Sequence, residues 1–419
     1  MRQTVGHPAT PAVAVGDEVK MGQIIGEPAD PVGVPIVATT SGTVTAVEER
    51  PGPEGRSELS VVIAADGEDA WETEPAVDDG ALSLTPREML ERIRRAGVIN
   101  SGFGAEPSHR DLGTAIDPRG YVGVSGEPVT RSVDHLIVRA VDVDPAAHTL
   151  EAVLADGIEP ARRGFEVLKK ILDTSSIHLV LARAKGRGLD MAAIERFCEP
   201  MEIWPVPADP TQYPTLNDQM LIRQITGMEV GGAFRESRDM GVIVENIDTV
   251  VAVGRAVMEN RPQVDRVVWV SGRVREPKLL RVRIGTSLQD TIAACGGPVG
   301  HPGAVLFGGP MRGRAQHDLS APVTRLSGAI TVLGADELVE FTNEPCMNCG
   351  ACVRTCPVRL MPNVLSKLCE YGEFDEALNF DLLTCIECGC CTFVCPSLRA
   401  NGHFLLHGKT EVMSRRRRA

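Results

Sequence analysis

Two cysteine motifs near the carboxyl end constrain this chain more than any other feature of its sequence. Most of its twelve cysteines lie between residues 346 and 395. A disulfide-bonded protein spreads its cysteines over its domains, whereas crowding at short spacing indicates metal binding. The two motifs are Cys346-x2-Cys349-x2-Cys352-x3-Cys356-Pro357 and Cys385-x2-Cys388-x2-Cys391-x3-Cys395-Pro396.

This spacing is typical of ferredoxins with two [4Fe–4S] clusters. In that pattern three cysteines of one motif bind one cluster, and the fourth, which precedes a proline, reaches the other cluster. The sequence therefore predicts two [4Fe–4S] clusters with crossed ligand sets. The first set is Cys346, Cys349, Cys352 and Cys395, and the second is Cys385, Cys388, Cys391 and Cys356.

Zinc is the alternative interpretation of the array, and it fits poorly. A structural zinc ion takes four ligands, commonly from two separated Cys-x2-Cys pairs, and two intact longer motifs do not match this. Cys390 breaks the spacing beside Cys391, so it is expected to be a bystander. The isolated Cys198, Cys295 and Cys369 are expected to be small buried side chains.

The residues between the motifs have an apolar pattern that is typical of helices. Residues 340–419 are therefore predicted to form a ferredoxin domain of the α-helical kind rather than the small β-rich kind. The apolar positions on which this rests are Val364, Leu365, Leu368, Phe374 and Leu378.

The charge of the chain excludes some classes of partner. The net charge is −13, whereas nucleic-acid binding needs a basic surface. The basic block Arg415–Arg418 is interpreted as a solvated tail, with a contact to an acidic partner protein or anionic membrane surface as the alternative. No apolar run reaches the roughly 18 residues of a membrane span, and no signal segment begins the sequence. We expect a cytoplasmic protein, peripheral to the inner face of the cell membrane only through partner subunits.

The first part of the chain has the pattern of a compact β-module. In residues 1–75, short Val-rich runs alternate with Gly-Asp and Ser-Gly turns, which is typical of hairpins. This text resembles the barrel-sandwich fold of lipoyl and biotinyl domains. Those domains carry a modified Lys at a hairpin tip, but the tip at residues 26–35 has none. A structural or docking module is therefore expected, followed by a linker at residues 76–84.

The middle of the chain is predicted to hold an α/β domain and then a β-grasp unit. A helix starts at Thr85, with Glu88 completing a capping box. Buried strands at 135–143 and 177–183 alternate with helices at 161–173, 217–227 and 248–259, which favours a largely parallel sheet over residues 85–262. Residues 263–335 change to strands around a helix capped by Thr286, as in a β-grasp domain of the SLBB type.

With these features in place, the whole chain resembles the RnfC family, whose members are subunits of the Rnf electron-transport complex. It also resembles the cobalamin reductase of propanediol microcompartments and, more distantly, the FMN- and NADH-binding subunit of respiratory complex I. The matching text includes HPATPAVAVGDEVKMGQ, PTQYPTLNDQMLIRQITGMEV, GVIVENIDT, VRIGTSLQDTIAACGG, FGGPMRG and the two cysteine motifs. The resemblance implies FMN and NADH in the α/β domain, and electron transfer through the β-grasp and ferredoxin domains.

The flavin loop implied by the resemblance is altered here. Its glycine-rich pattern corresponds to residues 100–111, where Phe103 replaces a glycine, Glu106 an aromatic residue and Asp111 a lysine. Phe103 is expected to block the approach of a phosphate, and the two carboxylates to repel it. The flavin segments corresponding to residues 139–145 and 215–218 also differ. Gly102, Pro107 and Asn246 are kept, and Ser108 stands in place of a threonine.

These features leave three functions open. The favoured one is an electron relay through two [4Fe–4S] clusters, without FMN or NADH, between a partner flavoprotein or ferredoxin and another redox-complex or membrane subunit. The alternative is an FMN-dependent subunit that oxidises NADH and reduces ferredoxin, a quinone-linked chain or a corrinoid, with the flavin in a shifted mode. The third is a docking subunit with vestigial clusters, which the intact ligand sets disfavour. No catalytic residue is assigned, because His109 and His135 lack a partner visible in the sequence.

Overall fold

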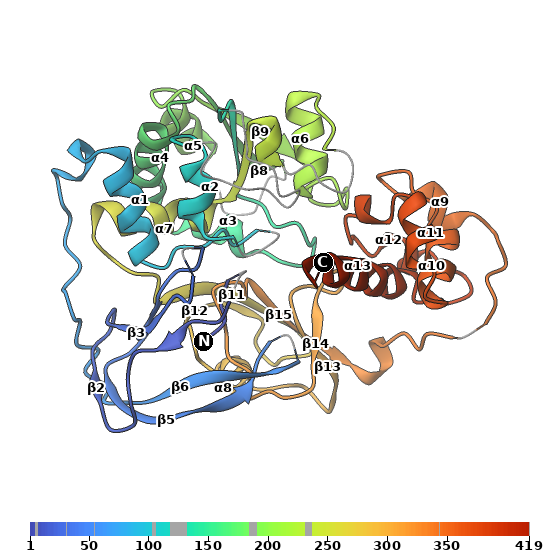
Figure 1. Cartoon of the computed structure of the whole chain (residues 1–419), viewed down its shortest axis with the longest axis horizontal. Helices are drawn as coiled ribbons and strands as arrows, with labels where there is room; N and C mark the ends of the chain where they lie inside the picture. Colours follow the sequence, from blue (N-terminus) through green and yellow to red (C-terminus); the bar gives the residue numbers. More distant parts are fainter. Residues whose placement is uncertain are drawn as a thin grey trace.

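The structure is a computed structural model that describes residues 1–4, 7–30, 32–53, 55–102, 106–117, 132–183, 191–230, 237–342 and 344–418. Two β-rich units and an α/β unit lie together, and the carboxyl-terminal helices form a lobe beside them (Figure 1). Among the described residues, no helix is both long and apolar enough to cross a membrane.

The first unit packs two small antiparallel sheets against each other. Their strand orders are β1-β3-β4 and β2-β5-β6. Alternating side chains such as Val19, Ile25 and Val44 fill the space between the sheets. The strands are β1 (Thr10–Pro11), β2 (Glu18–Val19), β3 (Ile24–Glu27), β4 (Ile36–Val37), β5 (Gly42–Pro51) and β6 (Ser57–Ala65).

The α/β unit has a parallel sheet of order β10-β7-β8-β9 in the part of the chain that the structure describes. Its strands are β7 (His135–Arg139), β8 (Ser176–Ala182), β9 (Ile203–Ala208) and β10 (Val242–Asn246). The helical segments are η1 (Ala81–Ser83), α1 (Pro86–Arg95), α2 (Ser108–Gly113), α3 (Thr149–Ala155), α4 (Ile158–Leu172), α5 (Met191–Cys198), α6 (Asp218–Thr226), η3 (Ser237–Met240) and α7 (Ile247–Met258).

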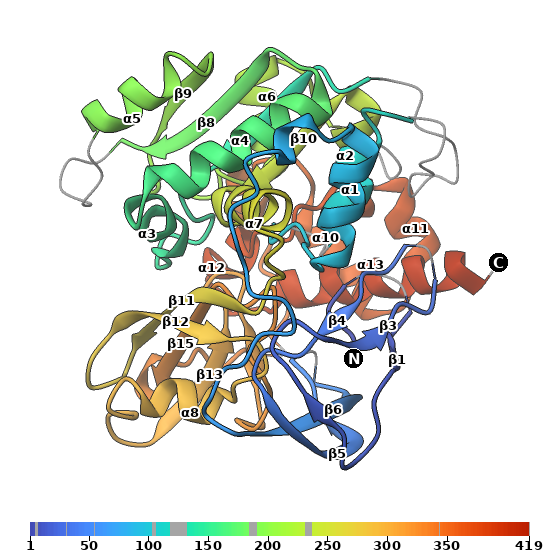
Figure 2. The same ribbon diagram turned by 90° about the vertical axis from the view of Figure 1, so that its left-hand side faces the viewer.

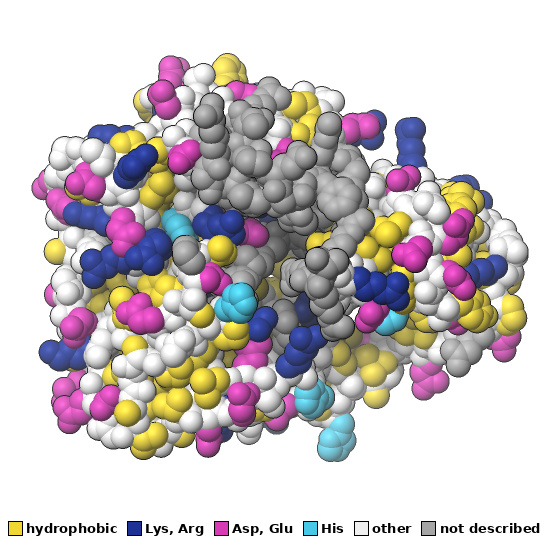
Figure 3. All heavy atoms as spheres, viewed as in Figure 1, with side chains coloured by type: hydrophobic (Ala, Val, Ile, Leu, Met, Phe, Trp, Pro, Cys, Tyr) yellow, Lys and Arg dark blue, Asp and Glu magenta, His cyan; other side chains and the backbone are white. Residues whose placement is uncertain are grey.

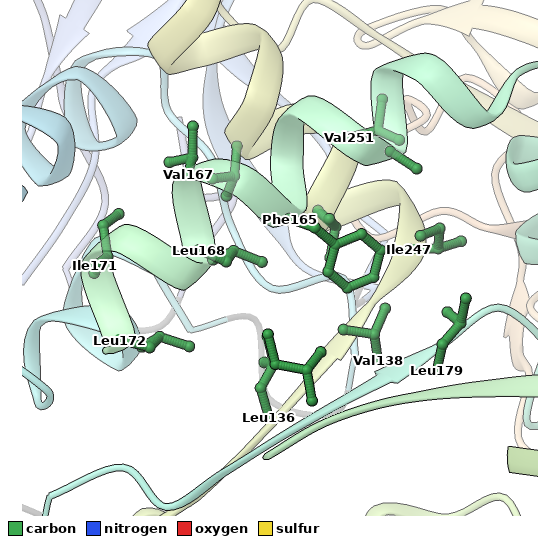
Figure 4. Packing of buried hydrophobic residues seen from close by; sticks show 14 of the residues in the cluster. Leu136, Val138, Phe165, Val167, Leu168, Ile171, Leu172, Leu179, Ile247 and Val251 are labelled. Atoms are coloured by element: carbon green, nitrogen blue, oxygen red, sulfur yellow. The ribbon is translucent and has the colours of Figure 1, made fainter. Parts of the chain in front are cut away.

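Helices cover both faces of this sheet. On one face, Phe165 and Leu168 of α4 pack with strand residues Leu136 and Val138, beside α7 (Figure 4). On the other face, α6 buries its apolar residues against the same strands. Helices α4 and α7 approach each other closely, since a methyl group added to Gly164 would lie 2.1 Å from the Val250 carbonyl oxygen.

The next unit is a mixed five-stranded sheet of order β12-β11-β15-β13-β14 with α8 packed on it. Strand β11 runs parallel to β15 and antiparallel to β12. The Arg283 guanidinium donates to the Thr39 carbonyl oxygen over 2.7 Å, which ties this unit to the first one. Its elements are β11 (Asp265–Gly272), β12 (Lys278–Arg283), α8 (Leu288–Ala293), β13 (Pro302–Phe307), β14 (Arg314–Gln316), β15 (Ala329–Gly334) and η4 (Ala335–Glu337).

The cysteine-rich part is helical, and its longest helix, α13, packs against α10 and α11. Leu365, Phe374 and Leu405 fill the core between these helices. The elements are α9 (Ala351–Thr355), α10 (Pro362–Glu370), α11 (Phe374–Asn379), η5 (Leu382–Thr384), α12 (Cys390–Phe393) and α13 (Asn401–Arg418).

Most predicted elements lie within a few residues of the expected positions. The Thr85–Glu88 capping box is confirmed, because Thr85 accepts from the Glu88 N–H and Glu88 accepts from the Thr85 N–H. The expected cap at Thr286 is wrong by one residue. Ser287 caps α8 instead, accepting from the Asp290 N–H over 3.0 Å, because Thr286 lies in the bend that follows β12.

Candidate iron–sulfur centre and the α/β crevice

The two cysteine motifs fold into loops with matching backbone conformations. In each loop, the residues just before and just after the second cysteine have a left-handed backbone conformation. The third residue after the fourth cysteine has the same conformation. Non-glycine residues seldom adopt this conformation, so its repetition indicates one local fold used twice. The matched pairs and their φ angles are Asn348 (56°) and Glu387 (55°), Gly350 (73°) and Gly389 (77°), and Arg359 (57°) and Leu398 (46°).

These loops turn backbone N–H groups toward sulfur. The Asn348 N–H donates to Cys346 Sγ over 3.4 Å, and the Glu387 N–H donates to Cys385 Sγ over 3.5 Å. The Leu360 N–H donates to Cys356 Sγ over 3.3 Å. Hydrogen bonds of this kind stabilise thiolate ligands and tune the potential of an iron–sulfur cluster. The donor set and the loop geometry therefore fit such a cluster.

A cavity of about 720 Å³ opens beside the second motif. Cys385, Cys388 and Cys391 line it together with Cys356, which comes from the first motif. The fold thus brings the four cysteines of the predicted second set to one space. Within the described ranges, no three His, Cys, Asp or Glu side chains lie close enough to hold a single metal ion.

The first motif lies nearer to solvent than the second. Cys349 is exposed, whereas Cys388, at the same place in the second motif, is buried. The first cysteines of the motifs, Cys346 and Cys385, are both partly buried, and the third ones are both buried. Met347, inside the first loop, is 64% exposed. The second motif also has an exposed apolar side chain, Phe393 on α12, at 80%. Figure 3 shows further apolar side chains on the lobe that α9–α12 form. At its second cysteine the first loop is therefore the more exposed of the two.

Burial controls the protonation of the cysteine thiols. It raises the pKa of Cys385 to about 11 and that of Cys391 to about 12. A hydrogen bond with the Cys390 thiol lowers the pKa of Cys388 to about 6. Because iron binds thiolates, occupation of this site releases protons from the buried cysteines.

The remaining cysteines occupy cores or contact a predicted ligand. Cys198, Cys295 and Cys369 are buried in three different hydrophobic clusters. Cys390 is also buried, and it packs with Ile386 and Cys388. Its role as a bystander remains a prediction.

Parts of the two preceding units contact the second loop. The Tyr213 hydroxyl donates to the Cys388 carbonyl oxygen over 2.6 Å. A methyl group added to Gly389 would lie 2.8 Å from the Met311 carbonyl oxygen, so the β13–β14 loop leaves no room there for a side chain. The buried loop is thus held by both the α/β unit and the five-stranded unit. No pattern in the sequence selects Tyr213 for this contact.

The four segments that the resemblance aligned with a flavin site lie together at the carboxyl ends of β7 and β10. One side chain, Arg139, joins them and is only 2% exposed. Its Nε donates to Asn246 Oδ1 over 2.9 Å, and its Nη1 donates to Asp218 Oδ1 over 2.6 Å and to the Leu216 carbonyl oxygen over 3.1 Å. A methyl group added to Gly102 would lie 3.0 Å from Arg139 Nη2.

This crevice is where open α/β sheets place their ligands. There the Arg139 Nε and Nη1 groups donate to protein acceptors, and Asn246 donates to Ser101 Oγ over 2.9 Å. Arg139 therefore ties the aligned segments to one another. The family resemblance shows that residues 139–145 differ from the flavin segment. It does not show which residues Arg139 contacts in the fold.

The expectation that Glu106 and Asp111 would repel a phosphate needs correction. Asp111 is 5% exposed and forms a close ion pair with Arg238. Glu106 lies 3.5 Å from the Arg110 guanidinium. Each carboxylate is therefore neutralised by a cation. Phe103, the other residue in that argument, lies outside the described residues.

The two candidate histidines do not form a catalytic group together. His135 does have a partner, since its Nδ1 lies 2.8 Å from Ser176 Oγ, at the end of the sheet opposite the crevice. His109 is largely buried beside Arg94 and Arg110, and burial lowers its pKa to about 4. Neither ring lies at the cysteine loops.

The arrangement of the units and the duplicated cysteine loops define the class of iron–sulfur electron-transfer subunits of redox complexes. Residues 1–68 match the family described as RnfC barrel sandwich hybrid domain, and residues 267–315 match the SLBB domain. Over 90% of its length the chain is 32% identical to the subunit designated C in the proton-translocating ferredoxin:NAD(+) oxidoreductase complex of Clostridium ljungdahlii, covering 79% of that protein. It is 30% identical over 89% of its length to the counterpart in the Na(+)-translocating complex of Acetobacterium woodii, covering 81% of it. The chain belongs to the RnfC family, which these subunits of ion-translocating complexes represent.

The fold also resembles a subunit of a solved enzyme. The chain in the crystal structure of NAD+-reducing [NiFe]-hydrogenase in the air-oxidized state superposes with a TM-score of 0.51 at 17% identity. The match covers 70% of this chain and 54% of the hydrogenase chain. At this identity the likeness concerns the fold alone.

Proposed function

We propose that this protein relays electrons through two [4Fe–4S] clusters held by the crossed cysteine sets. Each cluster, when bound, accepts and donates one electron. The observation that carries the proposal is the repeated loop conformation, with N–H groups donating to cysteine sulfur in both motifs. The helical packing of residues 340–419 supports a ferredoxin domain of the α-helical kind.

The chain's own residues give the two sites different tasks. The first loop, with exposed Cys349 and Met347, is the side on which a redox partner approaches. The second loop is fixed by contacts with Tyr213 and Met311, and its Cys388 and Cys391 are buried. Since relatives are named as subunits of ferredoxin:NAD(+) oxidoreductase complexes, the partners we propose are other subunits of such a complex, through which this chain associates with the membrane.

Iron analysis of cysteine variants tests the ligand sets. Anaerobically reconstituted protein should contain about eight irons per chain. Cys356→Ala should remove the cluster formed mainly by the second motif, and Cys395→Ala the cluster formed mainly by the first, each leaving about four irons. Loss of the cluster from the variant's own motif instead would contradict the crossed assignment.

The alternative, an FMN-dependent NADH-oxidising subunit, is disfavoured by Arg139. We propose that this guanidinium takes the place of a flavin, and that electrons neither enter nor leave through the crevice. Titration with FMN should give no binding tighter than the millimolar range, about −4 kcal/mol, and NADH should not reduce viologen. Micromolar FMN binding by the unaltered chain would favour the alternative, while leaving the cluster assignment intact.

A further inference from the structure

A small cavity lies between the α/β unit and the five-stranded unit, separate from the cysteine loops and from Arg139. Its volume is about 60 Å³. The turn between α3 and α4, one side of α7, residues 261–267 and β12 line it. In Figure 2, β11 and β12 lie next to α3 and α7. The cavity thus lies at the junction of two units.

Arginines dominate the lining of this cavity. Four guanidinium groups face three carboxylates, which leaves one positive charge in excess. Arg261 and Arg281 bind Asp265, Arg281 also binds Asp156, and Arg266 binds Asp248. The fourth, Arg255 on α7, makes no side-chain hydrogen bond or ion pair within the described residues.

Arg266 supplies a second, independent observation. This residue is 6% exposed, and only its Nη2 has a partner, Asp248 Oδ2 at 2.9 Å. Its Nε and Nη1 are buried and have no acceptor among the described residues. A buried charged donor without an acceptor is strongly unfavourable. An acceptor from outside the protein would remove this penalty.

The amino end of α4 lies at the same wall. Helix α4 is 15 residues long, and its N-cap, Gly157, provides no side chain to accept from the first turn. Gly157 and Pro160 both line the cavity, and because Pro160 has no N–H, the backbone donor at this wall is Gly157. The free N–H groups and the dipole of a helix amino end favour an anion.

We propose that this cavity binds a tetrahedral oxyanion of phosphate size, held by Arg255, Arg266 and the amino end of α4. The cavity volume suits one such ion and leaves no room for a nucleoside. The bound ion would link the α/β unit to the five-stranded unit. This site does not depend on the assignment of the clusters.

Equilibrium dialysis with radiolabelled inorganic phosphate tests the site on the full-length, cluster-containing protein. We expect one phosphate per chain and at least about tenfold weaker binding by Arg255→Gln, since a charge-assisted contact is lost. Arg196→Gln, on an exposed part of α5, is the matched control and should bind as the unaltered chain does. Equal iron content in all three proteins shows that the variants fold.

Competition with two other anions, adenosine monophosphate and sulfate, tests the size of the site. Adenosine monophosphate should fail to displace the labelled phosphate, whereas sulfate should compete. Displacement by the nucleotide would contradict the proposal, because a cavity of about 60 Å³ has no room for a nucleoside. The proposal is overturned if no stoichiometric phosphate is retained, or if Arg255→Gln and Arg196→Gln retain it equally.

Discussion

Arg139 shows how one side chain alters the chemistry available to a fold. Its three hydrogen bonds join β7, β10 and the start of α6, at the edge where a sheet of this kind places its ligand. A buried arginine satisfied in this way costs several kcal/mol to remove, because its acceptors would be left unpaired. The Arg139 side chain therefore binds the groups at this edge that could otherwise contact a ligand.

Replacing Cys390 tests whether its sulfur atom is a cluster ligand. Replacing it with alanine should leave about eight irons per chain, because its position breaks the ligand spacing. The Cys388→Ala variant is the control and should lose about four irons. Colorimetric iron analysis distinguishes the two. A loss of four irons from Cys390→Ala would show that this thiol is a ligand.

Glu245, at the end of β10, should make stability depend on pH. It is 1% exposed, and neither carboxylate oxygen has a partner among the described residues. Burial, and then the charge of Asp248, raises its pKa well above the ordinary value. Its contribution to stability is therefore fully present below the ordinary pKa, near pH 4.5, and is lost as the pH rises.

The corresponding measurement is the thermal midpoint between pH 5 and pH 8. The unaltered chain should lose stability as the pH rises over this range, because the pKa of Glu245 is raised in the folded state. Glu245→Gln should remove most of this slope, and Glu72→Gln, in an exposed position, should not. Identical slopes in all three proteins would rule out Glu245 as the cause.

Sequence reasoning succeeds at this scale only where partners are near in the chain. The cysteine spacing predicts the ligand loops because a motif of eleven residues folds locally. The role of Asp111 is not visible in the sequence, because Arg238, its partner, lies 127 residues away. The same holds for Arg139, since Asn246 is 107 residues distant. The charge of a side chain is evident from a sequence, but its neutralisation by a distant residue is not.

At the scale of elements, the contact between α4 and α7 depends on two facing glycines. A methyl group on Gly254 would lie 2.7 Å from the Gly164 nitrogen. The apolar patterns of both helices predict that they form, but not how closely they approach. That distance follows from residues in each helix that have no side chain.

Gly164→Ala should therefore destabilise the α/β unit by about 1–3 kcal/mol through overpacking. Gly113→Ala in α2 is the matched control, because its added methyl would lie 3.8 Å from Leu90. That change should be neutral or stabilising by about 0.5 kcal/mol. Chemical denaturation measures both. Equal effects would mean that the two helices separate at little cost.

At the scale of the whole molecule, the second cysteine loop joins three units. Tyr213 and Met311 reach it from units that precede it by more than 70 residues. Tyr213→Phe removes the hydrogen bond to the Cys388 carbonyl and should leave the iron content unchanged. The electron paramagnetic resonance signal of one reduced cluster should shift while the other stays fixed. A change in both signals, or in neither, would contradict this local role.

The unequal exposure of the two cysteine loops has a consequence for how oxygen damages the protein. Oxygen and oxidants reach an outward loop first, and exposed thiolates are the ones that oxidise. On the proposed assignment, the first cluster should decay while the second, closed in by Tyr213 and Met311, persists. Such damage would leave a protein that still contains iron and is still brown. It would have lost the cluster that exchanges electrons with other proteins.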